Sequence, residues 1–177
     1  MRWTVLLAAA SLIGCATHIG APQTRDEFVS MYKTGGLFTK VEHTTVERPL
    51  KAVTADVAEY TKKCLAVRTT RPANYQLREV GGTTIYNPKL ETARPGVTAL
   101  SVQEYHGRPE TGMPPDGLYT FVAEFQSAGT KSTQLDMYYL STRGGISEAL
   151  KQWAAGDKRG CPNLQNLGAI DSPLTPS

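Results

Sequence analysis

The sequence of 177 residues predicts an α+β fold, in which an antiparallel sheet of about five to six strands carries two amphipathic helices packed on one face. Three observations predict it. Apolar residues recur at helical spacing in two separate stretches, while β-branched and aromatic residues alternate with polar ones between them. Gly- and Pro-rich turns separate the alternating stretches, which is typical of strands that pair with their neighbours in opposite directions.

The first strand and the first long helix adjoin one another. Residues 37–48 are rich in Thr and Val, which predicts a strand. Pro49 then stands where a helix begins, at its first position. The apolar stripe of this helix recurs at spacings of three and four residues: Leu50, Val53, Val57, Tyr60 and Cys64. Charged residues occupy the other face, so we expect the helix to pack on the sheet with its apolar side.

Several strands follow this helix. Residues 65–70 predict a strand, and residues 75–86 predict a hairpin with a Gly-Gly turn. Residues 94–96 predict another turn, which leads into a strand over residues 97–105. Residues 106–117 contain three Pro and three Gly, so they predict a long exposed loop.

Two further strands and a second helix complete the pattern. One strand covers residues 118–126. Its alternate residues are expected to share the face that packs toward the helices: Tyr119, Phe121, Ala123 and Phe125. The next strand carries Leu135, Met137 and Tyr139 on its apolar face, and the two strands are expected to pair. The second helix is indicated by Ile146, Ala149, Leu150 and Trp153, and it ends near Gly156.

The N-terminus has the features of an export signal. Arg2 supplies a positive charge, and residues 5–13 form an apolar stretch. That stretch is shorter than the roughly 20 residues that a membrane-spanning helix needs, so it predicts a signal peptide. It ends in the tetrapeptide Leu12-Ile13-Gly14-Cys15, which resembles the lipobox of bacterial lipoprotein precursors.

This resemblance implies a lipid anchor at Cys15. The family pattern implies a diacylglyceryl group on the Cys15 sulfur, cleavage after Gly14 and acylation of the new amino terminus, with palmitate as the expected chain. Several acyl chains hold a protein on a membrane far more stably than one. Ala16 follows in place of Asp, which by analogy with Gram-negative sorting implies the periplasmic face of the outer membrane. An inner-membrane or Gram-positive surface location stays open.

The export pattern divides the chain into four parts. We expect a cleaved signal peptide over residues 1–14, a lipid-anchored tether and lead-in over 15–35, one α+β domain over 36–165 and a flexible tail over 166–177. A turn or two of helix is expected in the lead-in. The order of elements is loosely similar to helix-grip or BamC-like envelope lipoprotein domains, a resemblance of fold that carries no shared motif.

Export also changes the interpretation of Cys64 and Cys161. In an oxidising compartment an even pair of cysteines suggests a disulfide. One cysteine ends the first predicted helix and the other follows the second, so a bond between them would join the two helices. Two buried free thiols or a cysteine nucleophile are the alternatives.

No catalytic motif emerges from the sequence, so we predict a protein that is not an enzyme, without cofactor or metal. His106 opens the long loop between Glu104 and Glu110, and a His flanked by carboxylates suits a metal or acid–base catalysis. The spacing matches no zinc pattern, however. Glu104, Glu110 and Asp116 are also candidate paired carboxylates of a hydrolase, although solvation of the loop explains them equally well. We therefore treat His106, Glu110 and Asp116 as a candidate binding loop.

Three hypotheses of function follow. Without residues 1–14 the side chains carry a net charge of +2, too small to indicate nucleic acid as a partner. The first hypothesis is a membrane-anchored binding or assembly module of the cell envelope, which meets a protein partner through residues 107–117 and an open sheet surface. The second is a carrier of a small apolar ligand or lipid between the sheet and residues 50–64, which a dry apolar cavity would favour. The third is a cell-wall hydrolase.

Overall fold

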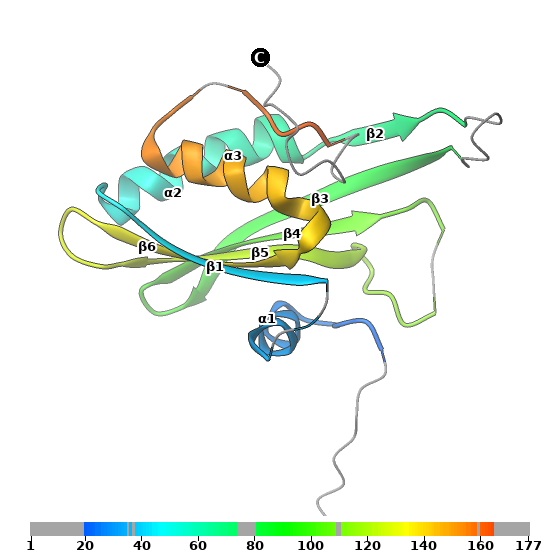
Figure 1. Cartoon of the computed structure of the whole chain (residues 1–177), viewed down its shortest axis with the longest axis horizontal. Coiled ribbons are helices and arrows are strands. Elements are labelled where there is room, and N and C mark those ends of the chain that lie inside the picture. Colours follow the sequence, from blue (N-terminus) through cyan, green and yellow to red (C-terminus); the bar gives the residue numbers. More distant parts are fainter. Residues whose placement is uncertain are drawn as a thin grey trace, which may run out of the picture.

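One antiparallel sheet of six strands forms the centre of the protein (Figure 1). The computed structural model describes residues 20–34, 36, 38–73, 81–108, 111–158 and 160–164. The strands are β1 (Thr39–Val46), β2 (Arg68–Arg71), β3 (Gly82–Arg94), β4 (Val97–Tyr105), β5 (Leu118–Ser127) and β6 (Thr133–Leu140). They lie in the order β1-β6-β5-β4-β3-β2, and every neighbouring pair is antiparallel. The predicted α+β fold with one antiparallel sheet is confirmed.

Helices cover both faces of this sheet. They are α1 (Arg25–Lys33), α2 (Leu50–Tyr60), which continues into the π-helical turn η1 (Thr61–Leu65), and α3 (Gly144–Ala155), which follows the 3-10 turn η2 (Ser141–Arg143). α2 and α3 lie over one face, whereas α1 lies against the other (Figure 1). Phe28, Val29 and Tyr32 of α1 pack against Val122 and Tyr138 of the sheet. The lead-in thus contributes a third layer that the sequence did not predict.

The main core fills the space between the sheet and the pair α2 and α3. Val53 and Val57 from α2, and Leu150 and Trp153 from α3, are fully buried in it. The predicted apolar face of β6 belongs to the same core: Leu135, Met137 and Tyr139. Burial of such side chains is the main force that holds these helices on the sheet.

A β-bulge in β5 changes the face of one predicted core residue. Tyr119 and Phe121 pair with successive residues of β4, so Thr120 is an extra residue in the strand. Phe121 lies in the main core, but Tyr119 turns to the other face, where its ring centroid is 6.1 Å from that of Phe28. The prediction that Tyr119 shares a face with Phe121 is therefore wrong, because a regular alternation assumes a strand without an extra residue.

The second difference concerns the hairpin predicted over residues 75–86. β3 begins at Gly82 and pairs with β2, while residues 74–80 lie outside the described part of the chain. A Cβ at Gly81 would come within 2.4 Å of the backbone nitrogen of Ala73. Gly81 thus stands where two chain segments come close together, and Gly82 is the first residue of β3.

An arginine side chain joins α2 to the end of α3. Arg48 Nη2 donates to Asp56 Oδ2 at 2.8 Å, and Arg48 Nη1 donates to the carbonyl oxygen of Ala154 at 2.8 Å. The Asp56 side chain is 14% exposed. The hydrogen bond from Arg48, aided by the charge of Lys158 and opposed by burial, holds the pKa of Asp56 below its usual value.

We expect Asp56→Asn to lower the free energy of unfolding by about 1–3 kcal/mol at neutral pH. A carboxyl group with a lowered folded-state pKa stabilises the fold above its unfolded-state pKa of about 3.8. This stabilisation disappears as the pH falls through the folded-state pKa, so the two proteins should converge in strong acid. Urea unfolding across this pH range measures the difference, with Glu59→Gln on the exposed side of α2 as the control. A loss that does not change with pH would contradict the prediction.

Candidate binding site

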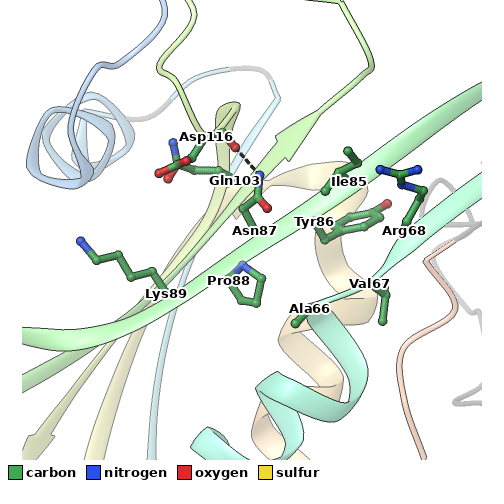
Figure 2. A pocket seen from close by; sticks show the side chains of 10 residues that line it. All are labelled: Ala66, Val67, Arg68, Ile85, Tyr86, Asn87, Pro88, Lys89, Gln103 and Asp116. Carbon is green, nitrogen blue, oxygen red and sulfur yellow. Dashed lines mark hydrogen bonds between the residues drawn. The ribbon is translucent and has the colours of Figure 1, made fainter.

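A cavity of about 570 Å³ lies along the outer side of β3 (Figure 2). Residues 66–68, from the end of η1 to the first residue of β2, form one part of its wall, and residues 85–89 of β3 form another. Gln103 of β4 and Asp116 of the loop before β5 complete the lining. The cavity therefore brings together four segments that are separated in the sequence.

The cavity exists because β2 is much shorter than β3. β2 pairs with residues 82–85. One further hydrogen bond follows, from the Tyr86 backbone nitrogen to the carbonyl oxygen of Val67, just before β2, at 2.9 Å. Residues 87–94 pair with β4 on one side, and no strand within the described part of the chain pairs with their other side. This leaves an open sheet edge beside the cavity, with backbone groups that an added strand would use.

Pro88 indicates which backbone groups face this open side. In an antiparallel sheet, successive residues direct their N–H and C=O groups to opposite neighbours. The backbone N–H of Tyr86 donates a hydrogen bond outward to Val67. The backbone polar groups of every second residue after it, Pro88, Leu90 and Thr92, are therefore also directed outward. Proline has no N–H and is tolerated in sheets at an edge position of this kind. The edge therefore offers N–H groups at Leu90 and Thr92 and carbonyl groups at all three positions.

Polar side chains hold the loop against the cavity. Asn87 Nδ2 donates to the carbonyl oxygen of Asp116 at 2.7 Å, as the dashed line in Figure 2 marks. Gln103 Nε2 donates to the carbonyl oxygen of Gly117 at 2.8 Å.

The hydrogen bond and charge of Glu91 raise the pKa of Lys89, whose Nζ lies 2.7 Å from Glu91 Oε2. The cavity thus has charged groups of both signs along its border.

The end of the loop requires glycine at position 117. Gly117 has φ +104°, and a Cβ there would lie 2.4 Å from the carbonyl oxygen of Glu104. We expect Gly117→Ala to lower the free energy of unfolding by about 2–3 kcal/mol, because both strain and a backbone collision result. Gly112→Ala is the matched control, since Gly112 has φ +79° with open space around it. Urea unfolding of the two variants should show the larger loss at position 117, and equal losses would contradict the collision.

Two residues of the predicted binding loop, His106 and Asp116, have different neighbours in the structure. Asp116 lines the cavity, whereas His106 lies beside β3, with its Nδ1 3.2 Å from Thr84 Oγ1. His106 Nε2 is 3.8 Å from Glu104 Oε2. Glu110 lies outside the described residues, as does Cys15. In the part of the chain that is described, no three His, Cys, Asp or Glu side chains are grouped so that they could hold a metal ion.

Glu104 is a buried structural carboxylate. Arg143 of η2 donates Nε and Nη2 to its two oxygens at 2.5 and 2.6 Å, and Thr120 of the bulge donates its hydroxyl at 2.9 Å. The Glu104 side chain is 1% exposed. Its oxygens are therefore occupied and shielded from any substrate, and the three residues join β4, β5 and η2.

The two remaining cysteines lie at disulfide-bonding distance, as the sequence predicts. Their Sγ atoms are 2.00 Å apart, and their Cα atoms are 5.2 Å apart. Cys64 belongs to η1 and Cys161 follows α3, so the bond connects the ends of the two helices on the main core.

The β3 side of this site was missed in the sequence. Gln103 stands in a predicted strand and gave no signal of its own, and Lys89 lies beyond residue 86, where the predicted hairpin ended although β3 continues to Arg94. Pro88 was the available signal, because proline inside a strand-like segment indicates an edge strand. The cavity itself depends on where β2 ends, which local pattern does not determine.

Comparison with known proteins adds no function to this geometry. Among the described helices, none is both long enough and apolar enough to cross a membrane. No protein-family model and no curated protein sequence matches the chain.

Proposed function

We propose that the mature protein is a lipid-anchored periplasmic module that binds an extended segment of an envelope protein along the open edge of β3. The anchor is inferred from the resemblance of residues 12–15 to a lipobox. The outer-membrane location is inferred from Ala16, by analogy with Gram-negative sorting. Binding rests on one observation: residues 87–94 form an open sheet edge beside a cavity of about 570 Å³.

Strand addition is the recognition mode that this edge supports. An added strand forms main-chain hydrogen bonds with the outward groups of Leu90 and Thr92, and its alternate side chains reach the cavity. Pro88 removes one donor and so disfavours indiscriminate pairing with other sheet edges. Arg68, Lys89 and Asp116 in the lining favour a segment with polar or charged side chains of both signs.

The other two hypotheses have less support. A carrier of an apolar ligand needs space between the sheet and α2, but Val53, Val57 and Leu100 fill that region and are fully buried. The cavity outside it has a partly polar lining, which suits a peptide better than a lipid chain. A cell-wall hydrolase needs accessible paired carboxylates, and Glu104 is buried against Arg143.

Site-specific photocrosslinking in cells tests the proposed binding edge. A photoreactive amino acid at position 89 should yield a defined product with an envelope protein, whereas one at position 51, on the exposed side of α2, should not. Absence of a product at position 89, or the same products at both positions, would contradict the proposal.

Backbone pairing is tested by a second pair of variants. Thr92→Pro removes an outward N–H and should abolish the product at position 89, because the added strand loses a hydrogen bond and meets the ring. Thr92→Ala keeps the N–H and should leave the product unchanged. Thermal unfolding of both variants verifies that they fold. A folded Thr92→Pro protein that still crosslinks would show that the partner does not pair with this strand.

A further inference from the structure

The strand β1 runs along one border of the sheet, and its outer side is open (Figure 1). β6 pairs with all eight residues of β1 on the inner side, and among the residues that the structure describes no second strand pairs with it. Val41, His43 and Thr45 are exposed, so the helices leave this strand accessible. The open side therefore presents backbone groups that another strand can pair with.

The ladder between β1 and β6 shows which backbone groups of β1 point outward. The Ser141 nitrogen donates to the Phe38 carbonyl oxygen at 2.9 Å, and these two residues lie opposite one another, one step before the first pair of the ladder. Successive residues of an antiparallel strand direct their N–H and C=O groups to opposite sides. Phe38 and every second residue after it therefore bond toward β6, and the other residues of β1 direct these groups outward: Thr39, Val41, His43 and Thr45.

Lys40 and Glu42 place opposite charges on one face of β1. They lie opposite Tyr139 and Met137 of β6, and both of these β6 residues belong to the main core. Lys40 and Glu42 are therefore on the face that carries α2 and α3, and Val41 lies between them on the other face. Lys40 is exposed, and the side chain of Glu42 is 34% exposed. A complementary strand has an anion opposite Lys40 and a cation opposite Glu42.

β1 is complementary to a second copy of itself in one antiparallel register. A twofold axis at Val41 sets Thr39 opposite His43 of the second copy and Lys40 opposite Glu42 of the second copy, and the reverse pairs follow by symmetry. The outward backbone groups at positions 39, 41 and 43 then form hydrogen-bonded pairs. Lys40 and Glu42 form the non-hydrogen-bonded pairs, in which side chains approach more closely. The two copies of Val41, whose side chain is 38% exposed, cover one another at the centre.

Charge disfavours the neighbouring registers. A twofold axis at Lys40 sets that residue against Lys40 of the second copy, and an axis at Glu42 sets two carboxylates against one another. Like charges directly opposite on paired strands are unfavourable. An axis at Thr39 or at His43 places neither charge opposite one of the other sign. The register centred on Val41 is thus the one that pairs opposite charges.

We infer that the protein forms a homodimer in which the β1 edges of two copies pair antiparallel, with Val41 on the twofold axis. The two sheets then join into one continuous sheet, and the open parts of β3 lie toward its two outer ends. The axis is perpendicular to the sheet, so α1 of both copies lies on the same face, which allows both of the proposed Cys15 anchors to enter one membrane. The pairing itself depends neither on the anchor nor on the binding edge proposed at β3.

Oxidation of an added cysteine tests this register in intact cells that express the full chain. In Val41→Cys the two added cysteines lie directly opposite, with Cα atoms about 5.5 Å apart, which a disulfide can bridge. His43→Cys is the matched control on the same exposed face of β1. It lies opposite Thr39 of the second copy, so its two cysteines are about 14 Å apart, too far for a disulfide.

We expect a covalent dimer of Val41→Cys and none of His43→Cys or of the parent chain, which controls for the three native cysteines. Absence of the dimer at position 41, or equal amounts at positions 41 and 43, would overturn the inference. A product that links position 41 to a different protein would also overturn it, because the edge would then belong to another partner.

The contribution of charge is tested without a covalent bond. Sedimentation equilibrium of the full chain with Cys15→Ser measures the dimer Kd with no lipid to drive association. Lys40→Glu replaces two attractive cross-strand pairs by two repulsive ones, so we expect it to raise the Kd about tenfold. Lys40→Gln removes the attraction without adding repulsion, and its Kd should fall between those of the parent and Lys40→Glu.

Lys51→Glu is the matched control, because it makes the same change of charge at an exposed position of α2 and should leave the Kd unchanged. Far-UV circular dichroism verifies that each variant folds, and Lys40→Gln serves as the test if Lys40→Glu does not. A parent protein that stays monomeric refutes the dimer. Equal Kd values for the variants at positions 40 and 51 refute the register.

Discussion

Reduction of the Cys64–Cys161 disulfide is expected to lower the free energy of unfolding by about 4–5 kcal/mol. The bond joins residues that are 97 positions apart, so it closes most of the folded chain into one loop. A crosslink over so long a loop removes much of the conformational freedom of the unfolded state. Urea unfolding with and without a reducing agent measures the loss as a shift of the midpoint.

Cysteine variants control for the reducing agent itself. Cys64→Ala and Cys161→Ala should each lose as much stability as reduction does, and neither should respond further to the reducing agent. The chain has three cysteines, and the third is the expected site of lipidation, so no second disulfide complicates the comparison. Equal midpoints for the oxidised and reduced proteins would contradict a stabilising crosslink.

Replacing Arg143 by Leu is expected to lower the free energy of unfolding by about 3–5 kcal/mol, because it leaves a buried carboxylate without its cation. Glu104 is fully buried, and Arg143 supplies two of the three hydrogen bonds described for its oxygens. Burial of an unpaired charge is far more costly than burial of a pair of neutral groups. Urea unfolding of the variant against the parent protein measures this loss.

A double variant separates the charge from the packing. Glu104→Gln together with Arg143→Leu should be more stable than Arg143→Leu alone, because no buried charge remains in it. If the two single losses simply add in the double variant, the pair is not coupled and the explanation fails.

The elements that could be predicted are those whose signal is local. The apolar stripe from Leu50 to Tyr60 predicted α2, since helical periodicity reports burial of one face without knowledge of the partner. Pro49 was expected as the first residue of that helix, but it occupies the N-cap position and the helix begins at Leu50. β4 follows the predicted strand over residues 97–105 in the same way, and α3 ends before Gly156 as expected.

Features that depend on a partner strand could not be predicted. The bulge at Thr120 is defined by the register of β4 against β5, and it moved Tyr119 to the other face. Glu104 was interpreted as an exposed carboxylate beside a loop, because its partner Arg143 stands 39 positions later in the chain. The open edge of β3 likewise follows from the length difference between β2 and β3, which is a property of the assembled sheet.

Intact-mass analysis of the protein from membrane fractions tests the lipid-anchored module most directly. The account predicts a chain that begins at Cys15 and carries diacylglyceryl and acyl groups there, and a Cys15→Ser form that leaves the membrane fraction. An unmodified Cys15 with residues 1–14 still attached, or a Cys15→Ser form that stays on the membrane, would contradict it.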